Sequence, residues 1–104
     1  MASARIVVTS EAEADLLAIS AYIAERDGST RASQVMERIQ STFRNLAFMP
    51  GIGRSRSYLE PDRLAFSVRP WTIFYMRLPE HEGIRVLRVV DGRRNLPAIF
   101  GRGP

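Results

Sequence analysis

The stretch "SEAEADLLAISAYIAERDGSTRASQVMERIQSTFRNLAFMP", residues 10–50, decides the fold of this chain because it contains two helical periodicities. Apolar residues recur every three or four positions in both halves, which predicts two amphipathic helices. The two apolar stripes are Ala12, Leu16, Ile19 and Ile23, then Val35, Met36, Ile39, Phe43, Leu46 and Ala47. The connection "DGST" is short, so the helices should form an antiparallel hairpin.

Capping residues set the expected start and end of the first helix. Ser10 is predicted to be the N-cap, with Glu13 three residues later completing a capping box. Glu11, Glu13 and Asp15 should lie in the first turn, where the helix dipole favours acids. Gly28 is the predicted C-terminal stop. Tyr22, next to the apolar stripe, is expected to pack against the sheet.

The second helix should begin at Ser29 or Thr30, either of which can cap it, and end at Pro50. After this helix the apolar period changes from about 3.6 to two, which predicts strands over residues 64–69, 71–78 and 84–90. The β-branched run at residues 5–9 predicts one more strand, before the hairpin. We therefore expect one α+β domain over residues 1–104, with a helical hairpin on a small, mostly antiparallel, twisted sheet.

Composition limits the chemistry that the chain can perform. With 45% hydrophobic residues among 104, the chain can bury a core. It has no cysteine and a single histidine, His81, which excludes thiolate chemistry and argues against a protein-held transition metal. No apolar run approaches the roughly 20 residues of a membrane span, so we expect a cytoplasmic protein without cofactor or metal.

Positive charge gathers in the second half of the chain. Ten arginines stand against five acids after residue 50, whereas five arginines stand against six acids before it. Such asymmetry favours an anionic partner, either a nucleic acid or an acidic protein surface. Arg54 and Arg56 lie in the Gly-rich stretch "GIGRSRS", and Arg93 and Arg94 follow the last strand. Either pair could bind phosphate or a partner protein, or could lie in a solvated loop.

RNA cleavage by 2′-hydroxyl attack is the metal-independent chemistry open to a basic chain without cysteine. It requires a base, an acid and cations for the phosphorane. The candidate proton carriers are His81, Tyr22, Tyr58 and Tyr75, and none of them assembles into a catalytic set with the arginines. Trp71, at the start of the central strand, is expected either in the core or as an anchor for a partner.

Four motifs in order resemble those of the RelE/ParE toxins of bacterial toxin–antitoxin systems, and of the ParE branch of this family in particular. The motifs are "DLLAISAYIAE", "ERIQSTFRNLAFMPGIGRSR", "LAFSVRPWTIFYMR" and "IRVLRVVDGRRNLPAIF". Together they cover nearly the whole chain. The resemblance implies a helical hairpin against a small twisted sheet, as the periodicities predict, with a short helix or turn at the C-terminus.

The resemblance also separates two activities. RelE-like members are ribosome-dependent mRNA endonucleases, whereas ParE-type members poison DNA gyrase and are not nucleases. The nuclease pattern has an arginine where this chain has Thr72, basic residues in the strand "LAFSV", and a tyrosine where this chain has Phe100. Only Arg94 matches that pattern, so the departures favour the ParE type and no catalytic residue is assigned.

The resemblance then implies a toxin that inhibits gyrase by trapping its cleaved-DNA state. Arg54, Arg56, Arg93 and Arg94 are the predicted target-binding residues. A ParD-like antitoxin, expected to be disordered and acidic in its C-terminal segment, would fold over the groove between hairpin and sheet in a hetero-oligomer. Trp71 and Phe66 are candidate antitoxin anchors. The alternatives are a ribonuclease of RelE type using Arg94, and a protein that only binds its antitoxin.

Overall fold

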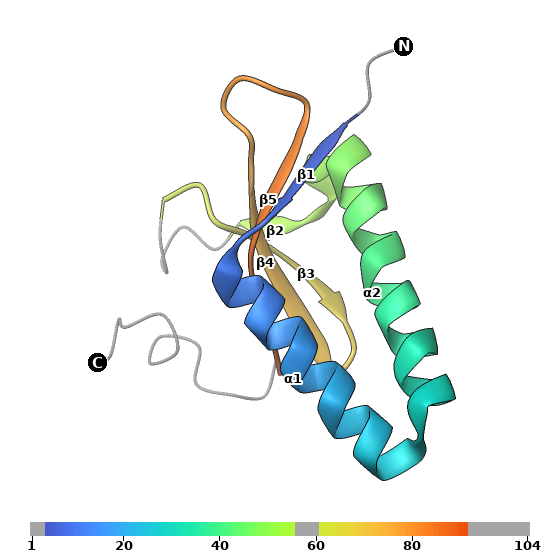
Figure 1. Ribbon diagram of the computed structural model, residues 1–104. Coiled ribbons are helices and arrows are strands. Elements are labelled where there is room, and N and C mark those ends of the chain that lie inside the picture. The colour runs from blue at the N-terminus through green and yellow to red at the C-terminus, as the bar shows by residue number, and fades with distance from the viewer. Residues whose placement is uncertain (1–3, 56–60, 92–104) are drawn as a thin grey trace, which may run out of the picture.

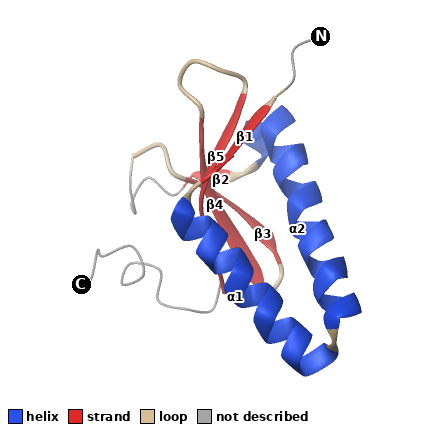
Figure 2. Ribbon diagram, viewed as in Figure 1, coloured by secondary structure: helices blue, strands red, loops and turns tan. Residues whose placement is uncertain are grey.

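Two helices lie side by side on one face of a small sheet (Figures 1 and 2). The structure is a computed structural model that describes residues 4–55 and 61–91. The elements in chain order are β1 (Arg5–Val8), α1 (Ser10–Asp27), α2 (Ser29–Phe48), the 3₁₀ helix η1 (Pro50–Ile52), β2 (Arg54–Ser55), β3 (Leu64–Val68), β4 (Trp71–Arg77) and β5 (Gly83–Asp91). The predicted α+β class, the helical hairpin and the final three-stranded meander are confirmed. No helix in the described part of the chain is long and apolar enough to span a membrane.

The sheet has five strands in the order β1-β5-β4-β3-β2. The pairs β5–β4, β4–β3 and β3–β2 are antiparallel, and β1 pairs with β5 in parallel. The predicted, mostly antiparallel sheet is therefore confirmed. One difference concerns the stretch "GIGRSRS", which was expected as a loop: its Arg54 and Ser55 form β2 and pair with Ala65 and Leu64.

The N-cap of α1 is Thr9, not Ser10, so the predicted capping box is wrong. The Thr9 Oγ1 accepts the backbone N–H of Ala12 at 3.2 Å and donates to the carbonyl of Leu87 at 3.0 Å. Ser10 is the first residue of the helix instead. Both residue types cap helices well, and the long-range bond from Thr9 to β5 selects between them.

Gly28 joins the two helices alone, at φ 92°, a backbone conformation that favours glycine. Its N–H donates to the carbonyl of Ala24 and so closes α1. Gly28 also occupies the N-cap position of α2, and no side chain caps that helix. The predicted caps Ser29 and Thr30 are thus wrong, because both already lie inside α2 and the turn is shorter than expected.

The core lies between the hairpin and the facing side of the sheet. Its buried helical members are Ala12, Ile23, Ala32, Val35, Ile39, Phe43, Leu46 and Ala47, and its buried strand members are Val68, Ile73, Tyr75, Ile84, Val86 and Val89. Both predicted stripes therefore face the sheet. Tyr22 does not pack against the sheet as predicted, because 59% of it is exposed.

Asp15 attaches α1 to β5, and it does not lie in the first turn as predicted. Its carboxylate accepts two bonds from Arg88, at 2.7 and 3.0 Å, and the backbone N–H of Val89 at 2.9 Å. The strand is irregular here, because Phe74 pairs with Arg88 and Tyr75 pairs with Val86, which leaves Leu87 out of the register. This bulge directs Arg88 toward the helix, where a bidentate pair forms.

Candidate functional site

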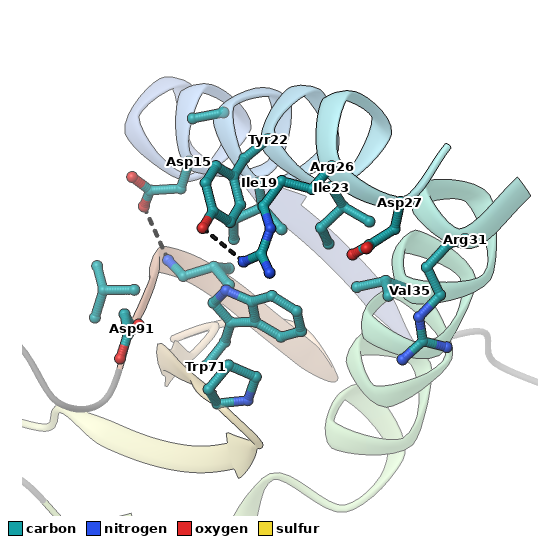
Figure 3. A pocket seen from close by; sticks show the side chains of 14 residues that line it. Asp15, Ile19, Tyr22, Ile23, Arg26, Asp27, Arg31, Val35, Trp71 and Asp91 are labelled. Carbon is teal, nitrogen blue, oxygen red and sulfur yellow. Dashed lines mark hydrogen bonds between the residues drawn. The ribbon is translucent and has the colours of Figure 1, made fainter. Parts of the chain in front are cut away.

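A pocket of about 480 Å³ opens between the tip of the helical hairpin and the end of the sheet. We call it the tip pocket (Figure 3). It is lined by Asp15, Ala18, Ile19, Tyr22, Ile23, Arg26 and Asp27 of α1, by Arg31 and Val35 of α2, and by Pro70, Trp71, Val89, Val90 and Asp91 of the sheet and its β3–β4 turn. Residues far apart in the sequence thus contribute to one concave surface.

Tyr22, Arg26 and Trp71 form the polar and aromatic rim of the tip pocket. The guanidinium of Arg26 donates to the Tyr22 hydroxyl at 2.8 Å and lies 5.3 Å from the centre of its ring. The hydrogen bond that Arg26 donates to Tyr22 raises the pKa of Arg26, with further contributions from the charges of Tyr22 and Asp27. Figure 3 shows the Arg26 guanidinium pointing toward the Trp71 indole. A cation and an indole therefore stand at the same opening.

The floor of the tip pocket is apolar and its edge is charged. Ile23, Val35 and Val89 are buried, whereas Arg26, Asp27 and Arg31 are exposed. Within residues 4–55 and 61–91, Arg31 makes no ion pair. Such a surface can accept an apolar side chain on the floor and a carboxylate at Arg31 or Arg26.

The predicted site residues do not come together in one place. Trp71 lines the tip pocket, but Phe66 packs against the core and does not line the pocket. Arg54 is exposed on the edge strand β2. Arg56, Arg93 and Arg94 lie outside the described residues, as do Tyr58, Phe100 and the expected C-terminal helix or turn.

At the other end of α2, three large apolar side chains are exposed. Phe48 is 70% exposed, Met49 61% and Ile52 45%. We call them the corner patch, since they surround the corner where α2 passes into η1. The sequence holds a signal for it that the stripe left out. Successive helical residues turn by about 100°, so the apolar run of residues 46–49 cannot face the core throughout.

Tyr75, in the central strand β4, fixes the backbone of this corner. Its buried hydroxyl donates to the carbonyl of Pro50 at 2.6 Å. Burial raises the pKa of the Tyr75 phenol, while a backbone hydrogen bond from Gly53 and the charge of Arg77 oppose the rise. Gly53 has no room for a side chain, because a Cβ there would collide with the Tyr75 hydroxyl. Tyr75 belongs to the core, and its hydroxyl has a structural partner.

The described residues bring no proton carrier next to a group of free cations. Tyr75 is bonded to Pro50, Tyr22 accepts from Arg26, and His81 lies exposed in the β4–β5 turn beside Glu80 and Glu82. Among these residues there is also no group of three or more acids and histidines placed to hold a metal ion.

The comparisons with known proteins agree on one family. Residues 6–96 match the family described as "ParE toxin of type II toxin-antitoxin system, parDE". The chain is 39% identical over 98 residues to the toxin ParE3 of Caulobacter vibrioides. The aligned residues cover 94% of this chain and 96% of that toxin. A solved structure of the chromosomal ParDE system from P. aeruginosa has the same fold, with a TM-score of 0.69 at 20% identity over 83% of this chain and 92% of that one. The predicted ParE resemblance is thereby confirmed, and the chain belongs to the ParE toxin family of type II toxin–antitoxin systems.

Proposed function

We propose that this toxin inhibits DNA gyrase by binding the enzyme and trapping its cleaved-DNA state, without catalysing a reaction itself. Membership of the ParE family supports the proposal. A second observation, independent of the family, also supports the proposal: the surroundings of the candidate proton carriers Tyr75, Tyr22 and His81. Tyr75 is buried and bonded to a backbone carbonyl, and the Tyr22 hydroxyl accepts a hydrogen bond from Arg26. His81 shares its groove with one arginine, Arg77, and with the acid Glu82. RNA cleavage needs a base and a cation at the same phosphate.

We propose the tip pocket as part of the surface that a ParD-like antitoxin covers. An acidic antitoxin segment could place an apolar side chain on the floor of the pocket, next to Trp71. A carboxylate of the same segment could then pair with Arg31 or with Arg26, and the bidentate geometry would fix its register. Trp71 stays the proposed anchor, whereas Phe66 has no place in this pocket.

The proposed target-binding residues remain Arg54, Arg56, Arg93 and Arg94. Arg54 is exposed and makes no ion pair with any described residue, so its guanidinium is available to a carboxylate or a phosphate. The other three lie outside the described residues, and their assignment rests on the sequence alone.

Two assays with purified toxin test the proposed function. In the first, the toxin should block supercoiling by gyrase and cause cleaved DNA to accumulate. In the second, ribosome-bound mRNA should stay intact. Cleaved mRNA with normal gyrase activity would contradict the proposal and favour the RelE-type ribonuclease. Inactivity in both assays would favour a chain that only binds its antitoxin.

A further inference from the structure

We propose that the corner patch is a second docking surface, separate from the tip pocket, and that it receives an acidic, partly apolar surface of the toxin's protein target. The inference rests on the proposed function only in taking gyrase as that target. It names residues outside the predicted target-binding set, namely Phe48, Met49 and Ile52, with Arg77 beside them.

The exposure of the corner patch has no explanation within the described fold. The sheet-facing side of α2 is complete without Phe48, because Leu46 and Ala47 already fill the core at that end of the helix. Phe48 and Met49 instead project from the end of α2, and Ile52 projects from η1. A neighbouring group of exposed apolar side chains marks a place where another molecule binds.

The patch is held in position by contacts below it. The Tyr75 hydroxyl binds the carbonyl of Pro50 at 2.6 Å, and the N–H of Ile52 donates to the carbonyl of Met49 at 3.2 Å. Gly53 allows the close approach of Tyr75. A rigid backbone reduces the entropy lost when a partner binds, which is what a docking surface requires.

A groove of about 260 Å³ next to Phe48 gives the partner a place for a side chain. It is lined by Ala47, Phe48, Pro50, Arg77, Leu78, His81, Glu82 and Gly83. Its wall at Phe48 and its buried Leu78 are apolar, and Arg77 is exposed at its rim. An apolar side chain of the partner fits between Phe48 and Leu78, with a carboxylate at Arg77.

The charges around the corner indicate the chemistry of the partner. Arg77 and Arg54 are exposed and make no ion pair with a described residue, while the exposed acids of the neighbouring β4–β5 turn are Glu80 and Glu82. The two guanidinium groups can each bind a carboxylate of a partner. Three exposed apolar side chains gain nothing from a phosphate backbone, so a protein surface fits better than DNA.

The corner patch and the tip pocket lie at opposite ends of α2, as Figure 1 shows for the two ends of that helix. Val35 lines the tip pocket and Phe48 lines the corner groove. Thirteen residues separate them, which is roughly 20 Å along a helix. Substitutions at one site can therefore be made without touching the other.

The test compares two variants of the full chain. The corner variant carries both Phe48→Gln and Met49→Gln, and Leu17→Gln is the control. Leu17 is as exposed as Phe48 but lies on α1. Each variant is induced in cells, and growth arrest is measured against the amount of toxin. The corner variant should need at least about tenfold more toxin for the same arrest, because two central apolar contacts are lost. The control should match the wild type in growth arrest.

Two further measurements on the same proteins separate the possible occupants. The melting temperature and the affinity for the antitoxin should stay unchanged in the corner variant, and its binding to purified gyrase without DNA should weaken. Unchanged growth arrest by the corner variant would overturn the inference. A loss of antitoxin affinity equal to the loss of arrest would do the same, and so would a wild-type toxin that binds DNA but not gyrase protein. If wild-type toxin does not bind gyrase, the proposed function fails, whereas the growth-arrest comparison still decides whether the corner patch meets the target.

Discussion

The two ends of α2 differ in shape, in charge and in how they are built. The tip pocket is concave, carries both signs of charge, and is assembled from α1, α2 and the ends of β4 and β5. The corner patch is apolar, is built from neighbouring residues near Tyr75, and lies beside arginines that make no ion pair with a described residue. The difference fits the two proposed roles, in which one end of α2 meets the antitoxin and the other end meets the target.

The largest effect should come from Asp15, because it attaches one wall of the tip pocket to the sheet. Asp15→Ala leaves Arg88 and the N–H of Val89 without this acceptor. Both partners of the ion pair are mostly buried, with side chains 15% and 23% exposed. We expect a loss of about 3 kcal/mol in the free energy of unfolding, measured by urea denaturation. Asp15→Asn, which keeps one acceptor oxygen, should lose less. An unchanged midpoint for Asp15→Ala would show that the tip pocket does not depend on this attachment.

The next effect concerns the affinity for the antitoxin. Trp71→Ala should weaken antitoxin binding by about 30-fold, as for a central aromatic anchor, and should leave growth arrest intact. Phe66→Ala is the matched control, since Phe66 also packs on the core but lies outside the tip pocket. Titration calorimetry measures both. Equal affinities for the two variants would mean that core packing, and not the pocket, determines binding.

A similar effect on stability is expected at the corner. Gly53→Ala places a methyl group against the Tyr75 hydroxyl and should lower the free energy of unfolding by about 2 kcal/mol. Gly51→Ala is its control, because a Cβ there would meet only the end of the flexible Arg77 side chain, at 3.0 Å. Gly53→Ala should also reduce growth arrest at a temperature where it is still folded. Growth arrest at the wild-type level would mean that toxicity does not depend on the shape of the corner.

The smallest effect is the loss of one hydroxyl. Tyr75→Phe removes the bond to Pro50 and should cost about 1 kcal/mol. Burial raises the pKa of Tyr75 in the folded protein, so the folded state keeps this proton more readily than the unfolded chain. The stabilisation should be complete below a pH of about 10 and should decline as the pH rises through the folded-state pKa. Denaturation curves of Tyr75→Phe should lack this decline, and an identical decline in both proteins would assign it to other groups.

The sequence predicted the hairpin and the meander because each depends on a local period, 3.6 for the helices and two for the strands. It did not predict the features that depend on contacts across the chain. Thr9 and Ser10 are equivalent by capping preference, and only the bond from Thr9 to Leu87 separates them. Asp15 resembled an ordinary acid of a first turn, because nothing local indicates its partner Arg88.

The candidate site was less predictable than the fold for the same reason. Trp71 could be identified from its residue type, but the pocket around it needs the helix tip and the strand ends to meet. Nothing local distinguishes Arg26 and Arg31, which line one pocket with Trp71 only because the hairpin folds onto the sheet. The corner patch was missed for another reason: Phe48 and Met49 continue the apolar run beyond Ala47, where the predicted stripe ends.

The most direct test of two separate surfaces is the accumulation of cleaved DNA by purified gyrase, measured with three toxins. Wild-type toxin and Trp71→Ala should both cause cleaved DNA to accumulate, whereas the double variant of Phe48→Gln and Met49→Gln should not. Accumulation by the corner variant at the wild-type level, or its loss in Trp71→Ala alone, would contradict the account.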